Sequence, residues 1–488
     1  MNNVTVSQTK SLSRTIADRR FDFFVMVAVL LVARAAASMV LPVYDDAFIT
    51  FRYARNLAAG FGFVYQPGQW VLGVTAPLFG IFLSLLYYFG LSVPQTVIAL
   101  NILLDAFIFT VTILCMNDDN DSVVLPLFVI FFGVSPIMNR ICVGGMEMNV
   151  FLFVSLIALF LYQKGFRYSA LCLAAISYFI RPEALILVGV IILVEMFSVR
   201  KRRVAFHILL AGAVIVPFLL ILHFYYGSVL PQSVLSKSRE IGSSVVDVSR
   251  TLIFSDVVCS VLVPFALYGI VRSFRRNLFV RVVTLWMIGY AAAYLLVRPH
   301  VWSWYGEPIH YAEFLLGAVG IADLIRRIGF YRVAERWSWK LGAVAILCVW
   351  CVILFRVGRS HVTESVYGGI QSWSREKDLS KDTILAGDIG VIGYYSSACI
   401  LDPAGLTWPE ALSFTSLRDI AVTRRPNYLF LNATRSNALM MNERPLDSLY
   451  SPLRRFSPEN YPIQNLRPEE LSENWSQDYI LYGRKIVP

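Results

Sequence analysis

The segment "VYDDAFITFRYARNLAAGFGFVYQPGQ", residues 43–69, contains two adjacent carboxylates and two arginines directly after an apolar stretch. A carboxylate can take the proton of an attacking hydroxyl group, and a guanidinium can bind the oxygens of a phosphate. Asp45 and Asp46 are therefore candidate general bases, and Arg52 and Arg55 are candidate phosphate ligands. A role limited to helix capping is the alternative for the aspartates, but one carboxylate is enough for a cap and a second adds repulsion.

The stretch "DAFITFRYARNLAAG" has the pattern of a short amphipathic helix that begins at Asp45 or Asp46 and ends at Gly60. It is too short to cross a bilayer, so we expect it to lie in the outer interface. Arg52 and Arg55 would then project from one side of the helix at the depth of the lipid phosphates.

Further polar and aromatic residues lie at the predicted outer ends of later apolar segments. Singly, each has a structural explanation as a helix cap, a snorkelling side chain or an interfacial aromatic residue. Their collection at one membrane surface instead favours a shared site, with Arg181 and Lys237 as further phosphate ligands. The other members are candidate substrate contacts: Glu147, Glu183, His300, Trp304, Tyr305 and His310.

The amino-acid composition indicates which kind of secondary structure positions these residues. The chain has 488 residues, of which 57% are hydrophobic and 16% charged, and a soluble core could not bury so much apolar side chain. The apolar residues form blocks long enough to cross a bilayer as helices. Basic residues gather in the short loops between blocks, which places those loops in the cytoplasm. We therefore expect an α-helical, multi-pass membrane protein with about 11 to 13 transmembrane helices.

The predicted organisation has three parts, namely a cytoplasmic tail at 1–20, a transmembrane domain at 21–358 with an external first loop at 42–75, and an external α/β domain at 359–488. The last part has turns and short β-prone runs. Its "GDIGVIGYY" contains three glycines, but their spacing departs from G-x-G-x-x-G, so no nucleotide site is expected there. The net charge of +10 comes mostly from loop residues, so we expect no nucleic-acid partner.

The order of several motifs resembles the GT-C class of membrane glycosyltransferases. The motifs are "YDDAFITFRYARNLAAGFGFVYQPG", "GVTAPL", "GGMEMN", "RPEA", "YYGSVLPQSVLSK", "WSWYGEP" and "GDIGVIGYYSSACILDPAGL". The similarity covers nearly the whole chain and is greatest to the bacterial branch that includes cell-wall arabinofuranosyltransferases and relatives of protein mannosyltransferases. Two departures concern sugar or acceptor choice: "GVTAP" replaces a fuller "GxTSP", and Met148 and Asn149 follow Glu147.

The resemblance implies a GT-C fold in the plasma (inner) membrane, with the active site on the periplasmic or extracellular side. It implies transfer of a sugar, such as arabinofuranose or a hexose, from a polyprenyl-phosphate donor to a glycan, lipid or protein acceptor. Family members use an acidic residue of the first loop as base, which corresponds to Asp45 here, with Asp46 second. We expect inversion at the anomeric carbon and no cofactor, because the leaving group is already a stable phosphate.

Two alternatives stay open. A divalent cation could be held by Asp45, Asp46, Glu147 and Glu183, since carboxylates are the ligands that such ions prefer. A transporter or flippase of lipid-linked sugars would show polar groups near the middle of several spans, where Asn101 and Asp105 are the clearest examples.

Overall fold

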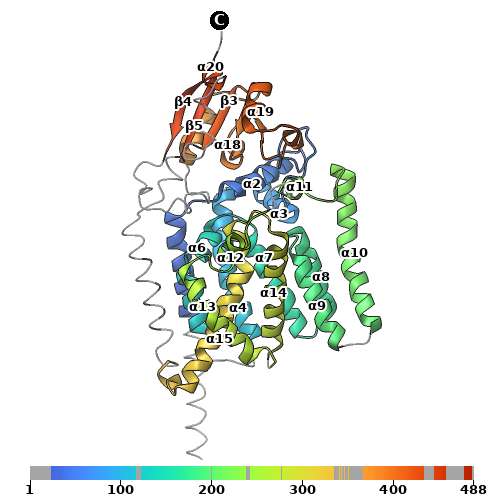
Figure 1. Ribbon diagram of the computed structural model, residues 1–488, viewed down its shortest axis with the longest axis vertical. Coiled ribbons are helices and arrows are strands. Elements are labelled where there is room, and N and C mark those ends of the chain that lie inside the picture. Colours follow the sequence, from blue (N-terminus) through green and yellow to red (C-terminus); the bar gives the residue numbers. More distant parts are fainter. Residues whose placement is uncertain are drawn as a thin grey trace, which may run out of the picture.

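The structure is a computed structural model. It describes residues 23–116, 123–198, 201–237, 242–275, 277–334, 366–432, 445–457 and 478–485, together with 340, 342, 344, 346 and 350. Most of these residues are helical, and a small sheet lies at one end of the helical body (Figure 1).

Several helices are long and apolar enough to cross a bilayer. Among the described residues there are five such helices, or up to seven when two bent pairs each count as one span. The five are Phe23–Val40, α4 (Val93–Cys115), Val204–Tyr226 within α10 (Lys201–Tyr226), α14 (Leu278–Val297) and Ser303–Arg327, which joins η4 (Ser303–Gly306) to α15 (Glu307–Arg327). The chain is therefore a multi-pass membrane protein. The predicted total of 11 to 13 spans stays a prediction, because most of the candidate span 339–357 lies outside the described residues.

Two helix breaks have a local cause in the sequence. The axis turns by 68° between α5 (Val124–Val134) and α6 (Pro136–Val143), and by 92° between α12 (Val245–Leu252) and α13 (Val257–Ser273). Pro136 disfavours a helical conformation for the residue before it, and that residue, Ser135, caps α6 at Met138 N. Asp256 caps α13 in the same way at Cys259 N. The Ser135 hydroxyl also donates to Asp256 at 2.7 Å, so the two breaks support each other.

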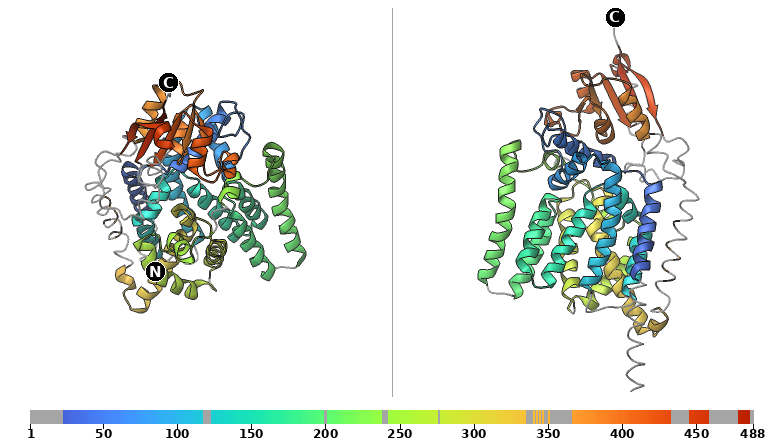
Figure 2. Two further views of the ribbon diagram at one scale, coloured as in Figure 1. Left: turned by 45° about the horizontal axis from the view of Figure 1, so that its top comes forward. Right: turned by 180° about the vertical axis from the view of Figure 1, so that it is seen from behind.

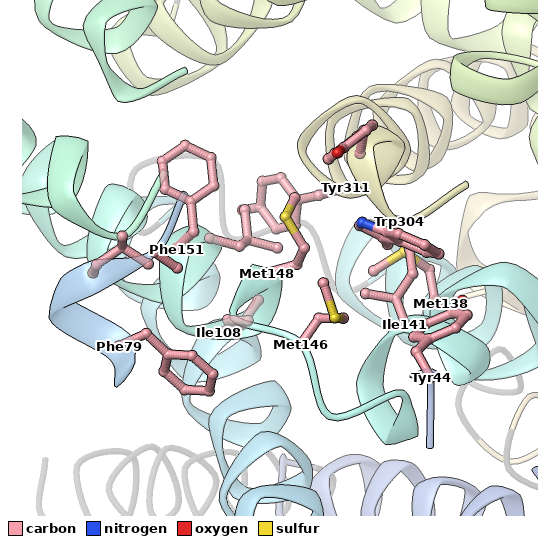
Figure 3. Close-up of a cluster of buried hydrophobic side chains, with 14 of the residues drawn as sticks. Tyr44, Phe79, Ile108, Met138, Ile141, Met146, Met148, Phe151, Trp304 and Tyr311 are labelled. Carbon is pink, nitrogen blue, oxygen red and sulfur yellow. The ribbon is translucent and has the colours of Figure 1, made fainter. Parts of the chain in front are cut away.

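Shorter helices complete the helical body. They are α3 (Pro77–Tyr88), α7 (Met148–Gln163), α8 (Arg167–Ile176) with η2 (Ser177–Phe179), and α9 (Ala184–Ser198). Beside the sheet domain lie α2 (Asp45–Ala58) and α11 (Gln232–Lys237), at the same end of the body (Figure 1). Below α2, the ring of Tyr44 packs on Trp304 with 4.6 Å between centroids, beside Met138, Ile141 and Met146 (Figure 3).

The C-terminal sheet has five strands in the order β2-β1-β3-β5-β4. Strand β1 (Thr383–Ala386) pairs in parallel with β2 (Cys399–Leu401) and β3 (Tyr428–Asn432), whereas β5 (Tyr479–Arg484) runs antiparallel to β3 and β4 (Tyr450–Phe456). Its helices are α17 (Gly368–Arg375), α18 (Gly390–Tyr395), η6 (Pro409–Ser413), α19 (Leu417–Arg424) and α20 (Leu446–Leu449).

One face of the sheet continues the core of the helical body. Ile384, Phe430 and Leu481 belong to the same buried cluster as α2, whereas Leu385 and Leu429 pack in a second cluster with Ile420 of α19. Figure 2 shows the sheet domain directly against the end of the body that carries α2. The sheet domain and the helical body are therefore joined through α2.

Candidate functional site

A cavity lies where α2, α11 and η4 meet the start of α7. Its walls come from segments that are far apart in the sequence, and each segment contributes the end of a helix or an adjoining loop. The lining residues are Asp46, Ile49, Thr50, Gly73, Val74, Thr75, Ala76, Met146, Glu147, Arg181, Ser233, Lys237, Trp304, Tyr305 and Leu406. Six of the twelve site residues predicted from the sequence are therefore brought together, namely Asp46, Glu147, Arg181, Lys237, Trp304 and Tyr305.

The volume of the cavity limits what it can hold. It measures about 50 Å³, and a water molecule needs about 10–15 Å³ of such space. A small polar group such as a phosphate fits this space, whereas a whole sugar ring does not.

Arg181 forms the buried centre of an ion network at the cavity wall. Its guanidinium donates to Glu147 at 2.9 Å and to Glu183 at 2.8 Å, and it lies over the ring of Tyr305 at 4.5 Å from the centroid. Tyr294 of α14 donates to Glu183 as well. Glu147 occupies the N-cap position of α7, but its carboxylate makes no capping bond. Its side chain therefore serves the ion network, and Glu183 supports that network without lining the cavity.

Lys237 contributes a second cation from the last turn of α11. Its ammonium group donates to the Tyr305 hydroxyl at 3.0 Å. Burial works against the charge on Lys237, but the interactions with Tyr305 and Asp46 outweigh it and raise the pKa of Lys237 above its usual value. Lys237 is therefore positively charged near neutral pH.

Asp45 faces away from the cavity and holds the sheet domain. Its two carboxylate oxygens each accept a backbone N–H bond of 2.8 Å, one from Gly390 and one from Val391, at the start of α18. Burial and the neighbouring carboxylates of Asp388 and Asp46 raise the pKa of Asp45 to about 8 against the effect of these two amides. Neither aspartate caps α2 as expected, because Tyr44 is the N-cap residue and makes no side-chain capping bond.

The two arginines of α2 also bind the sheet domain and do not line the cavity. Arg52 donates to the carbonyl oxygens of Gly393 at 2.8 Å and Ala398 at 3.2 Å, and to the Gln66 side chain at 2.9 Å. Arg55 donates to the Tyr394 carbonyl and lies over its ring. The structure thus gives both guanidinium groups protein partners, and neither lines the cavity as predicted for a phosphate ligand.

Two glycines of "GDIGVIGYY" have a packing role in the same contact. A Cβ atom on Gly390 would lie 1.8 Å from the Asp45 carbonyl oxygen, and one on Gly393 would lie 1.9 Å from the Tyr65 hydroxyl. The backbone of α18 can approach α2 this closely only because these residues lack a side chain. Gly390 and Gly393 are therefore explained by the close packing of α18 against α2 and Tyr65.

Sequence reasoning missed the loop that follows β2, in "DPAGLT". Asp402 accepts from the backbone N–H groups of Ala404 at 2.9 Å and Thr407 at 2.7 Å, which fixes the loop. Ser236 of α11 then donates to the Ala404 carbonyl, and Leu406 reaches the cavity. An Asp-Pro turn is a recognisable local signal, but its contact with α11 is not.

Two predicted histidines lie outside the cavity lining. His300 is exposed, and its ring packs edge-on against Trp302 at 4.8 Å between centroids. His310 is buried in α15, where it contacts Ser255, Cys259 and Glu313. Within the described part of the chain, Cys259, His310 and Glu313 form the group of ligand side chains close enough to share a metal ion. The four carboxylates predicted as cation ligands do not form such a group there.

The comparison of the chain with known protein families gives a match in the sheet domain. Residues 359–482 match a family described as a domain of unknown function (DUF8728). No curated protein matches the chain.

Proposed function

We propose that this protein is a membrane glycosyltransferase that moves a sugar from a polyprenyl-phosphate donor to an external acceptor. The observation that carries the proposal is the composition of the cavity, which combines two carboxylates, two cations and two aromatic rings at the end of a bundle of apolar helices. A lipid-linked donor needs all of these parts: a base, a site for the phosphate, a surface for the sugar and an apolar surrounding for the lipid. The similarity of the motifs to the GT-C class supports the same function.

In this proposal Asp46 is the general base. It lines the cavity, whereas the carboxylate of Asp45 is occupied by two amides of α18. The acceptor hydroxyl oxygen attacks the anomeric carbon as Asp46 takes its proton. The bond between that carbon and the phosphate oxygen breaks, and polyprenyl phosphate leaves. Base assistance of this kind contributes roughly 10²- to 10⁴-fold in rate.

Lys237 is the proposed ligand of the donor phosphate. Its ammonium group bonds to the Tyr305 hydroxyl, with the carboxylate of Asp46 in its surroundings, so it can turn to an incoming anion. Arg181 is neutralised by Glu147 and Glu183, and we assign it the task of holding Tyr305 and Glu147 in place. Trp304 and Tyr305 line the same cavity as Lys237, and we assign these two rings to the sugar.

The transporter alternative receives less support from the polar groups within the helices. Asp105 is fully buried, pairs with Arg34 at 2.5 Å and accepts from Asn149 at 2.5 Å. Asn101 is also buried and donates to the Met146 carbonyl at 3.2 Å. Both groups thus have hydrogen-bond partners on neighbouring segments, which accounts for them by packing within the protein rather than by a polar passage.

The test uses the full chain reconstituted in liposomes with radiolabelled polyprenyl-phosphate sugars and an envelope extract as acceptor. The wild-type protein should move label from the lipid to the acceptor, and Asp46→Asn should reduce the rate about 10²-fold or more. Asp247→Asn is the matched control, because Asp247 is exposed on α12 and bonds only locally to Ser244. Label that crosses the bilayer with its sugar–phosphate bond intact would indicate a flippase. Unchanged transfer by Asp46→Asn would remove Asp46 as the base.

A further inference from the structure

A buried cluster behind η4 brings a thiol, an imidazole and a carboxylate together. Cys259 lies in the first turn of α13, and His310 and Glu313 lie in the first two turns of α15. Nδ1 of His310 is 3.5 Å from the Cys259 sulfur and 3.3 Å from the Glu313 carboxylate. All three side chains are almost fully buried. None of them lines the cavity described above.

The hydrogen bonds around His310 determine which ring nitrogen carries the proton. The Ser255 hydroxyl donates to the Thr251 carbonyl, so its oxygen is left to accept from His310 Nε2 at 2.9 Å. A neutral imidazole has one donor and one acceptor nitrogen. His310 Nδ1 therefore presents a lone pair toward the sulfur and the carboxylate, and three electron-rich atoms converge within 4.8 Å of one another.

The observed separations match those of a tetrahedral metal site. Zinc binds sulfur at about 2.3 Å, nitrogen at about 2.0–2.1 Å and oxygen at about 2.0–2.2 Å. At tetrahedral angles these bond lengths require about 3.5 Å between sulfur and nitrogen and about 3.4 Å between nitrogen and oxygen. The structure has 3.5 Å and 3.3 Å for these two pairs.

We propose that Cys259, His310 and Glu313 bind a divalent transition-metal ion with the preferences of zinc. The mixed sulfur, nitrogen and oxygen ligand set is of the kind that zinc accepts, with a fourth position for water. Ser255 holds the outer nitrogen of the histidine ligand, as the second-shell partners of such ligands commonly do. This proposal does not depend on the proposed transferase activity.

The site joins α13 to α15 directly behind the cavity wall. His310 packs so closely on Gly306 that a Cβ atom there would lie 2.5 Å from Nε2. Gly306 ends the η4 segment that carries Trp304 and Tyr305. A bound ion would therefore fix the segment that presents these two rings. The break between α12 and α13 offers an entry path, because Ser255 and Asp256 are only half-buried.

Cobalt is a suitable probe, because its bond to a thiolate gives a charge-transfer absorption. Purified full-length protein in detergent, stripped with a chelator, should bind one Co²⁺ per chain with this band, and Zn²⁺ should displace it. Cys259→Ser should abolish the band, and Glu313→Gln should weaken binding at least about tenfold. Ser255→Ala, which changes only the orienting partner, should lower the affinity by about 10- to 100-fold. Cys115→Ser is the matched control, since Cys115 is also a buried thiol but lies on α4 outside the cluster.

Two results would overturn the proposal. One is the absence of a thiolate–cobalt band in the stripped wild-type protein. The other is a band of equal strength in Cys259→Ser, which would place the metal on another cysteine. If Cys259→Ser is lost to aggregation, the rate of Cys259 alkylation in the wild-type protein with and without Zn²⁺ answers the same question, because a metal-bound thiolate is protected. An unchanged alkylation rate would contradict metal binding.

Discussion

The two sides of α2 each carry an aspartate but serve different parts of the molecule. One side, with Asp45, Arg52 and Arg55, bonds to the backbone of the sheet domain. The other side, with Asp46, Ile49 and Thr50, lines the cavity. Because successive residues of a helix are about 100° apart, Asp45 and Asp46 necessarily point in different directions.

The difference shows that residue type alone does not assign a role to a charged side chain. On the domain side, each charge meets backbone N–H or C=O groups that remain in place in the folded protein. On the cavity side, Lys237 and Asp46 surround a space that a ligand can enter. The domain side should therefore govern stability, and the cavity side should govern activity, with Arg181 as an exception because it is buried between two carboxylates.

The largest effect on stability is expected for Arg181→Gln. This change leaves Glu147 and Glu183 as buried carboxylates without their cation, which should lower the free energy of unfolding by about 3–5 kcal/mol. Thermal unfolding and the yield of monodisperse protein in detergent would measure it. Arg327→Gln is the control, because Arg327 forms an exposed pair with Asp323 at 3.0 Å and should cost less than about 1 kcal/mol. Equal effects of the two variants would contradict the buried network.

Arg52→Met should separate the sheet domain from α2. It removes three hydrogen bonds from a buried cation, which we expect to cost about 3 kcal/mol. Limited proteolysis should then cut faster between the helical body and the sheet. Arg375→Met, at an exposed position of α17, should leave the cleavage rate unchanged. Protection equal to that of the wild type in Arg52→Met would show that this contact does not hold the domain.

Asp45 should make stability depend on pH. Its pKa is raised to about 8 in the folded protein from an ordinary value of 3.8, so the folded state binds the proton more tightly. The contribution of Asp45 is therefore fully present below about pH 4 and is lost as the pH rises toward 8, with a slope of at most about 1.4 kcal/mol per pH unit. The unfolding temperature should fall from pH 6 to pH 9 in the wild type. The decrease should be smaller in Asp45→Asn, and identical slopes would refute the assignment.

The smallest effect concerns the link between the sheet domain and the cavity. Ser236→Ala removes the bond from α11 to the Ala404 carbonyl, which should cost about 1 kcal/mol. If transfer activity is established, a less firmly held Lys237 should raise KM for the donor about fivefold. Ser228→Ala, at an exposed hydroxyl that bonds only to Leu230 nearby, is the control. A KM equal to that of the wild type in Ser236→Ala would show that the loop does not position α11.

Much of the architecture follows from the sequence alone. The apolar blocks predict a multi-pass helical protein because only lipid can accommodate so much hydrophobic surface. The short β-prone runs after residue 359 predict a small α/β domain, and the sheet of β1 to β5 confirms that such a domain is present. The two ends of α2 were also predicted closely from the sequence, because the spacing of its apolar residues and Gly60 after its last turn are local signals.

The tertiary structure decided which of the predicted residues meet. Six of them line one cavity, and this arrangement depends on how helix ends from residues 46 to 305 come together. The roles of Asp45, Arg52 and Arg55 depend on partners more than 330 residues away. The contact of His310 with Cys259 depends on the crossing of α13 and α15. The sequence determined the helices and strands, because hydrophobic periodicity and the residues that end a helix are local features. Their partners followed only from packing, which brings together segments that no local pattern connects.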